Sequence, residues 1–182
     1  MSDELVIRFC APTLASLKTG SLFACLNETE WELKRDVLSL NRRLHGAGLR
    51  VLPLKRRDGR WLVYVYRPRL LARDLGDRQA QAILDALGYP CPDACGCVRL
   101  LGERLRTQAE FPHEIGLFLG YPPEDVEGFM ARKGGAKCVG CWKVYGDAER
   151  AQRLFARYAR CTSACLARYA QGMGIEQLAV RS

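Results

Sequence analysis

One hairpin signal constrains the fold of this chain more than any other feature of its sequence. Two runs of strand-forming residues, 49–54 and 61–66, flank the dipeptide Asp58-Gly59, which is typical of a tight β-hairpin turn. In the second run, Trp61, Val63 and Val65 alternate with Leu62, Tyr64 and Tyr66. Both faces of this strand are therefore apolar or aromatic, and we expect it to be central in its sheet or covered on both sides.

Helix signals fill most of the remaining chain. We expect a first helix from Pro12 to Leu26 and a second helix that begins at a capping box of Asn27 and Glu30. The second helix carries apolar residues at helical spacing, namely Leu33, Val37, Leu40 and Leu44. Further helices are expected near 69–87 with a break at 76–77, and at 93–106 and 147–172. Two short elements are expected at 111–120 and 122–133, a strand at 139–145, and a short strand or last turn at 175–180.

These elements predict an α+β fold, a single domain over residues 1–182. Its sheet is expected to be small and mainly antiparallel, made of the hairpin 49–67 and a strand near 139–145, with several helices packed on it. The sequence holds no run of about 18 uncharged apolar residues, the length that spans a bilayer, so we expect no membrane partner. The acidic start, Met-Ser-Asp-Glu, is unlike a secretory signal, and we expect a cytoplasmic protein.

Positive charge is concentrated in one stretch of the chain. The formal net charge is +8, and residues 34–73 alone carry twelve Lys or Arg against two Asp. Basic and aromatic side chains on a β-ribbon can bind single-stranded nucleic acid. One hypothesis is therefore that this hairpin binds nucleic acid or another polyanion through Arg56, Arg57 and Arg60. The alternative is that its aromatic residues are core and its arginines a solvated rim.

Cys10 is a candidate nucleophile. It precedes Ala11-Pro12 at the expected start of the first helix, where free N–H groups and the helix dipole favour a thiolate. A thiol nucleophile needs a base, and His113, followed by Glu114, is the candidate. Cys10, His113 and Glu114 could thus form a triad of nucleophile, base and orienting carboxylate. The alternative is a buried, inert Cys10 and a capping His113.

Nine cysteines without an export signal favour metal ligation, redox chemistry or burial over a disulfide framework. Cys138 and Cys141 form a C-x-x-C knuckle, and Cys161 and Cys165 share one helix face. Together these four residues could hold zinc or an iron–sulfur cluster. Alternatively, the knuckle is a redox-active dithiol, or Cys161 and Cys165 simply belong to an apolar helix stripe.

Three segments carry a resemblance to a known family: Cys10–Phe23 (CAPTLASLKTGSLF), His113–Phe129 (HEIGLFLGYPPEDVEGF) and Cys138–Asp147 (CVGCWKVYGD). Over nearly its whole length the chain resembles a family of small bacterial proteins, common in Clostridia and other anaerobes, that is known only as a domain of unknown function. The resemblance implies no activity, substrate or cofactor. It implies that these three segments build the functional site.

The resulting hypothesis is a thiol- or metal-centred site built from Cys10, His113 and the Cys138–Cys141 knuckle. It ranks above the basic hairpin, which lies outside the three segments. A third hypothesis is an interaction protein whose cysteines are structural.

Overall fold

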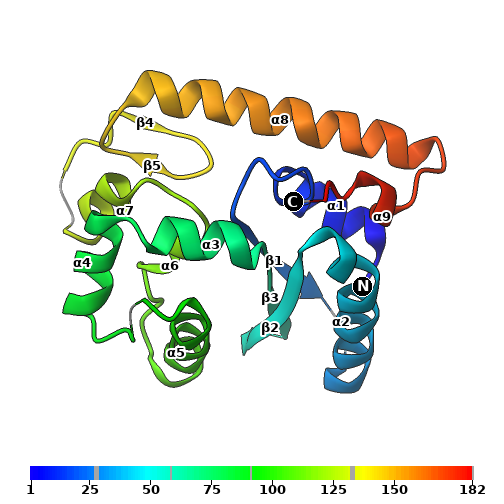
Figure 1. Cartoon of the computed structure of the whole chain (residues 1–182), viewed down its shortest axis with the longest axis horizontal. Coiled ribbons are helices and arrows are strands. Elements are labelled where there is room, and N and C mark those ends of the chain that lie inside the picture. Colours follow the sequence, from blue (N-terminus) through cyan, green and yellow to red (C-terminus); the bar gives the residue numbers. More distant parts are fainter. Residues whose placement is uncertain (27–28, 58, 91, 132–133, 182) are drawn as a thin grey trace. The chain divides into compact units, whose positions relative to one another are not determined.

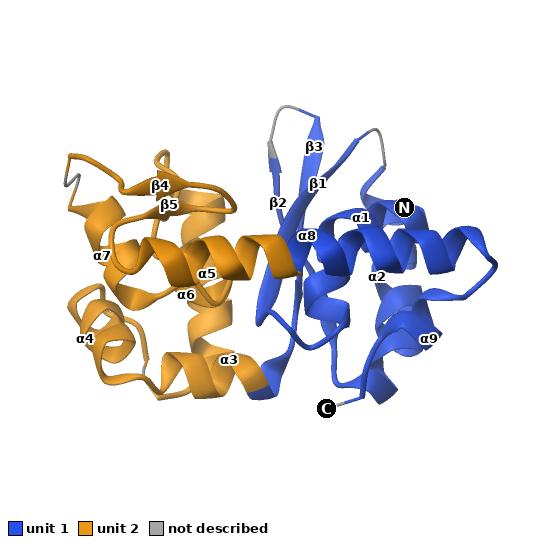
Figure 2. Ribbon diagram, turned by 90° about the horizontal axis from the view of Figure 1, so that it is seen from above, with its two compact units in different colours: residues 1–69, 158–182 blue, residues 70–157 orange. Residues whose placement is uncertain are grey.

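The computed structural model describes residues 1–26, 29–57, 59–90, 92–131 and 134–181 (Figure 1). The chain divides into two compact units, residues 1–69 with 158–182, and residues 70–157 (Figure 2). None of the helices in the described ranges has both the length and the apolar character needed to cross a membrane.

A three-stranded antiparallel sheet forms the centre of the first unit. Its strands are β1 (Gly20–Leu26), β2 (Arg50–Arg57) and β3 (Arg60–Tyr66), in the order β1-β3-β2. The expected hairpin is thus confirmed, and its second strand is central. Tyr64 and Val65 point to opposite faces and are both fully buried, because a central strand is covered on both sides.

Helices α1 (Asp3–Leu14), α2 (Glu30–Leu44) and α9 (Ile175–Leu178) contribute to the apolar core of this unit, together with a short 3₁₀ turn, His45–Ala47. The expected apolar positions of α2 are buried: Leu33, Val37, Leu40 and Leu44. A capping box starts this helix, but Thr29 and Glu32 form it. Asn27, the expected cap, lies outside the described residues. Asn41 ties α2 to β2 by exchanging two hydrogen bonds with the backbone of Val51, of 2.7 and 2.9 Å.

The predicted helix over residues 12–26 is wrong. Helix α1 begins nine residues earlier, at Asp3, where Ser2 caps it, and Pro12 lies in its last turn. The following segment forms strand β1, which pairs with β3 along its whole length. Phe23 and Cys25 of β1 are buried in alternation with exposed Ala24 and Leu26, a period of two that the sequence already contained. Pairing with a central strand outweighs local preference here.

The second unit is mainly helical. Its elements are α3 (Pro68–Leu75, which begins at the end of the first unit), α4 (Arg78–Ala86), α5 (Ala94–Thr107), α6 (Ile115–Phe118), α7 (Pro123–Met130), β4 (Cys138–Val139), β5 (Lys143–Val144) and the first part of α8 (Ala148–Ala170). The expected breaks near Gly76 and Gly120 and the Asp93 cap are confirmed. Segment 175–180 contains a last helical turn, α9.

The α+β class is confirmed, with one correction to the composition of the sheet. The segment near 139–145 does not extend the hairpin sheet. It folds back on itself as a separate two-stranded sheet, β4–β5, because Gly140 and Cys141 lie at a reversal of the chain where Gly140 donates to the Trp142 carbonyl at 3.0 Å. The third strand of the larger sheet is β1.

Candidate ligand-binding site

A buried carboxylate, Asp125 of α7, fixes the β4–β5 hairpin in the second unit. Asp125 is only 3% exposed. One carboxylate oxygen accepts hydrogen bonds from the backbone N–H groups of Tyr145 and Gly146, at 2.7 and 2.8 Å, and the other accepts from the Trp142 indole at 2.7 Å. A carboxylate can accept several such bonds, so this one side chain orients both ends of the second strand.

Aromatic packing holds the tip of the same hairpin. The Trp142 ring stacks on Tyr121, with ring centroids 4.6 Å apart, and meets Phe155 of α8 edge-on at the same distance. The Tyr121 hydroxyl donates to the Cys141 carbonyl at 3.3 Å, and burial raises the pKa of Tyr121 to about 12. Tyr121 therefore stays protonated and serves as a donor at neutral pH.

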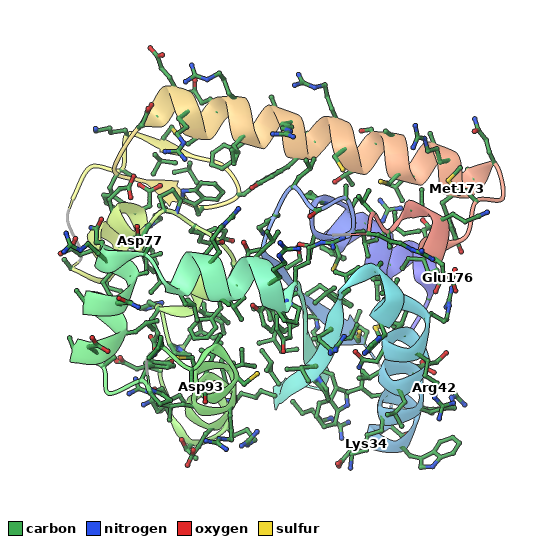
Figure 3. The ribbon with its side chains drawn as sticks, viewed as in Figure 1. Lys34, Arg42, Asp77, Asp93, Met173 and Glu176 are labelled. Carbon is green, nitrogen blue, oxygen red and sulfur yellow. The ribbon has the colours of Figure 1, made fainter. Side chains whose placement is uncertain are left out.

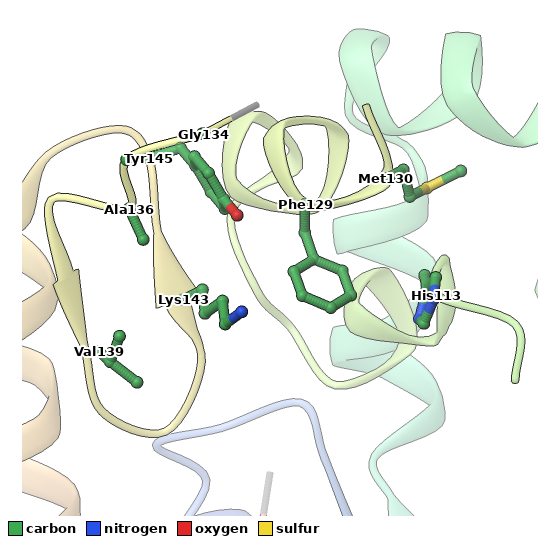
Figure 4. Close-up of a pocket in the computed structure, with 9 residues that line it drawn as sticks. His113, Phe129, Met130, Gly134, Ala136, Val139, Lys143 and Tyr145 are labelled. Carbon is green, nitrogen blue, oxygen red and sulfur yellow. The ribbon is translucent and has the colours of Figure 1, made fainter. Parts of the chain in front are cut away.

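A cavity of about 490 Å³ lies between α7 and this hairpin (Figure 4). Cavities of this size are typical of small-molecule sites. Its lining comes from four places in the chain: His113, Phe129 and Met130, the loop 134–136, and Val139, Lys143 and Tyr145 of the hairpin. Two of the three segments singled out from the sequence, 113–129 and 138–147, thus contribute to one site.

The polar groups of this cavity are cationic or hydrogen-bonding. The Lys143 ammonium lies 5.5 Å from the Phe129 ring centroid, and His113 meets the same ring edge-on at 4.9 Å. In Figure 4 Lys143 and His113 approach Phe129 from opposite sides. None of the described lining residues carries a carboxylate, and within the described chain Lys143 forms no ion pair. This arrangement favours an anionic ligand with an apolar part.

Glu114 has other partners than the expected His113. Its side chain is 4% exposed and accepts from the Tyr89 hydroxyl at 2.9 Å and from Arg104 at 3.2 Å. Burial raises the pKa of Tyr89, and the neighbouring Glu114 charge adds to the increase. Among the described residues no hydrogen bond joins Glu114 to His113. The orienting role of Glu114 therefore stays a prediction that these contacts do not support.

Cys10 lies in the apolar core of the first unit, fully buried. Cys10 does not lie at a helix N-terminus, as the sequence had predicted, because α1 begins at Asp3 and Cys10 lies in a later turn. Burial raises the pKa of the Cys10 thiol, and Lys18 offsets only part of this increase. The thiol is thus poorly prepared as a nucleophile, and its pairing with His113 stays a prediction.

The structure lends no support to the four-cysteine metal site. Within the residues that it describes, no group of three or more His, Cys, Asp or Glu side chains is placed to hold a metal ion. Cys165 is 8% exposed in the core of the first unit, and Cys161 packs against that core. Cys138 and Cys141 belong to the second unit, where Cys138 is half-buried and Cys141 exposed.

The basic hairpin is only partly available for binding. Arg56 and Arg60 are exposed, whereas the Arg57 side chain lies outside the described part of the structure. Tyr64 and Tyr66 of β3 are buried, so these rings cannot stack on bases. Arg67 is fully buried and donates to the backbone carbonyls of Thr13, Leu14, Ala47 and Val180.

Comparison with known proteins supplies the family. Residues 6–179 match a family described as protein of unknown function, DUF3793. The chain belongs to the DUF3793 family. The expected resemblance to a domain of unknown function is thereby confirmed. No curated protein and no solved structure matches the chain.

In this DUF3793 chain, sequence reasoning identified His113 but missed three residues that build its site. Lys143 and Tyr145 were within a recognised segment without a role, and Asp125 was within another. The alternation in 143–145 was a usable signal: Lys143 and Tyr145 flank buried Val144, so both share the opposite face of the strand. No local signal singled out Asp125, because its three partners are 17 to 21 residues away.

Proposed function

We propose that the second unit binds a small organic anion in the cavity beside His113. The observation that carries the proposal is the convergence of Lys143, His113 and the Phe129 ring on one cavity whose described lining has no carboxylate. A cation that lacks an ion-pair partner attracts a carboxylate or phosphate, and an aromatic wall favours a planar apolar group.

The chemistry of each wall gives the expected mode of binding. The Lys143 ammonium pairs with the anionic group, while the His113 imidazole and the Tyr145 hydroxyl supply directional hydrogen bonds. Phe129 and Met130 contact the apolar part of the ligand. Asp125 acts indirectly, since its bonds to the backbone of residues 145 and 146 hold the hairpin wall in place.

Calorimetric titration of the full chain with four shape-matched probes tests this proposal. Benzoate and phenyl phosphate are expected to bind, and neutral benzamide and cationic benzylamine are not. Lys143→Met should weaken phenyl phosphate binding roughly tenfold or more, the usual effect of losing one charged hydrogen-bond partner. Lys34→Met is the matched control, because Lys34 is exposed on α2 of the other unit. Equal binding of benzamide, or an unchanged Lys143→Met variant, would refute an anion site.

A thiol role for the knuckle is a second candidate for the same site. Val139 lies between the two knuckle cysteines and lines the cavity, and Cys141 is exposed. If Cys141 works with the cavity, saturating phenyl phosphate should slow its alkylation by iodoacetamide. Exposed Cys95 of α5 is the reference thiol, whose alkylation rate should not change. If phenyl phosphate leaves the alkylation rate of Cys141 unchanged as well, this candidate is removed.

A further inference from the structure

A second surface, in the first unit, carries an unusual combination of side chains. The solvent-facing side of α2 presents two large apolar residues, Trp31 at 68% exposure and Leu38 at 59%. Residues three to four positions apart share a helix face, and Arg35 and Arg42 complete the row opposite the buried side of the helix. The Arg35 guanidinium carbon lies over the Trp31 ring, 5.3 Å from the ring centroid. In Figure 3, Arg42 points away from the sheet.

The described end of β2 lies near the start of this row. Asn41 fixes α2 to Val51 of β2. Measured from the Asn41–Val51 contact, Trp31 lies about 15 Å back along α2. Arg56 lies about 16 Å forward along β2. Trp31 and Arg56 are therefore at similar distances from this contact. In agreement, Lys34 and, to a smaller extent, Arg56 lower the pKa of Glu30. The Arg56 side chain lies on the same sheet face as its partner Trp61, which packs against the core shared with α2.

We call this surface the basic–aromatic face and define it as Trp31, Arg35, Leu38, Arg42 and Arg56. Arg35 forms an ion pair with its neighbour Asp36 at 3.0 Å. By contrast, Arg42 and Arg56 form no ion pair with any residue that the structure describes. Two further guanidinium groups thus accompany Arg35 and one exposed indole ring.

We propose that the basic–aromatic face binds single-stranded nucleic acid, with one base stacked on Trp31 and phosphates paired with Arg42 and Arg56. A sequence-tolerant single-strand site combines cations that follow the backbone with an aromatic ring that accepts a base. Trp31 supplies the ring that the buried β3 tyrosines cannot supply. This proposal concerns the first unit and does not depend on the organic-anion site of the second.

Fluorescence anisotropy of a labelled 20-nucleotide oligo-dT strand, titrated with the full chain at 50 mM NaCl, tests the proposal. An abasic strand of equal length and charge is the matched ligand. Wild type is expected to bind oligo-dT more tightly than the abasic strand. Trp31→Ala should weaken oligo-dT binding about tenfold, the effect of one lost base–aromatic stack, and leave abasic binding unchanged. Trp31→Phe, which keeps a stacking ring, should recover most of the loss.

Charge variants give an independent readout. Arg56→Gln should reduce the slope of log Kd against log salt by about 0.7, the contribution of one phosphate contact on a single strand. Arg99→Gln removes an exposed arginine of α5 in the other unit and should change neither slope nor affinity.

Three results would overturn the proposal: no oligo-dT binding at 50 mM NaCl, equal affinity for the abasic strand, or an unchanged Trp31→Ala variant. Binding to phosphatidylglycerol vesicles in preference to oligo-dT, lost in Trp31→Ala, would assign the face to a lipid surface and would also overturn it. Because Trp31 is exposed, circular dichroism should show each variant folded like wild type.

Discussion

Asp125 accepts the indole N–H of Trp142 at 2.7 Å, and this bond joins α7 to the hairpin that forms one wall of the candidate site. The same carboxylate receives two backbone N–H groups from the far end of the hairpin. A helix and a short two-stranded sheet, which is marginal on its own, are thereby held together around the cavity. The geometry of the organic-anion site thus rests on one buried side chain.

Asp125→Ala is therefore expected to destabilise the protein by about 2–4 kcal/mol, because three donors lose a buried, charged acceptor. Asp125→Asn should also destabilise, since its amide nitrogen would face a donor. The free energy of unfolding in urea measures both effects. Asp85→Asn, an exposed change in α4, is the control. Stability equal to wild type in Asp125→Ala would contradict the assigned role.

A methyl group at Gly128 should disturb the cavity wall directly. A Cβ atom there would lie 2.6 Å from Cγ of Tyr145, so the ring must move. Gly128→Ala is expected to cost about 1–3 kcal/mol and to weaken phenyl phosphate binding. Gly46→Ala is the comparison, because open space surrounds its Cβ position and it lies in the first unit, away from the cavity. A higher thermal unfolding temperature for Gly128→Ala than for the comparison variant would be inconsistent with this packing.

Arg67 should be irreplaceable even by lysine. Its guanidinium is buried and reaches four carbonyls, from the end of α1, the 3₁₀ turn and the C-terminal segment. A lysine has one nitrogen and cannot span them, so Arg67→Lys should lose about 3 kcal/mol or more by leaving carbonyls unpaired. Exposed Arg69→Lys should be neutral. A stable Arg67→Lys protein would show that these bonds contribute little.

Cys10 should react slowly in the native protein. Because burial raises the pKa of its thiol, the reactive thiolate is scarce at pH 8 as well as at neutral pH. A pulse of iodoacetamide at pH 8, followed by peptide mass spectrometry, should label Cys141 at least about tenfold faster than Cys10. In urea the two rates should converge. Rapid native labelling of Cys10 would restore the nucleophile hypothesis.

The sequence correctly predicted the elements that depend on neighbouring residues in the chain. The antiparallel pairing of β2 with β3, the central position of β3 and the buried stripe of α2 are confirmed, whereas residue 58 of the predicted turn lies outside the described residues. The predicted first helix begins too late because a proline usually marks a helix start, whereas Pro12 lies in the last turn of α1. Strand β1 was missed because its pairing partner is about 40 residues away.

The candidate site was only half predictable for the same reason. His113 was identified, and segments 113–129 and 138–147 contribute to one cavity. The role of Asp125 and the proximity of Lys143 to Phe129 depend on tertiary packing across 14 to 21 residues. Similarly, the burial of Cys10 follows from the sheet that forms beside it rather than from its neighbours in the chain.

The organic-anion site is tested most directly by imidazole NMR, because the chain contains only two histidines. His113 lines the cavity, whereas His45 is exposed in the 3₁₀ turn of the other unit. During titration with phenyl phosphate, the His113 resonances, assigned by His113→Gln, should shift to saturation while those of His45 stay in place. Lys143→Met should need at least about tenfold more phenyl phosphate to reach the same shift. Unmoved His113 resonances, or equal drift of both histidines, would contradict an anion site at this cavity.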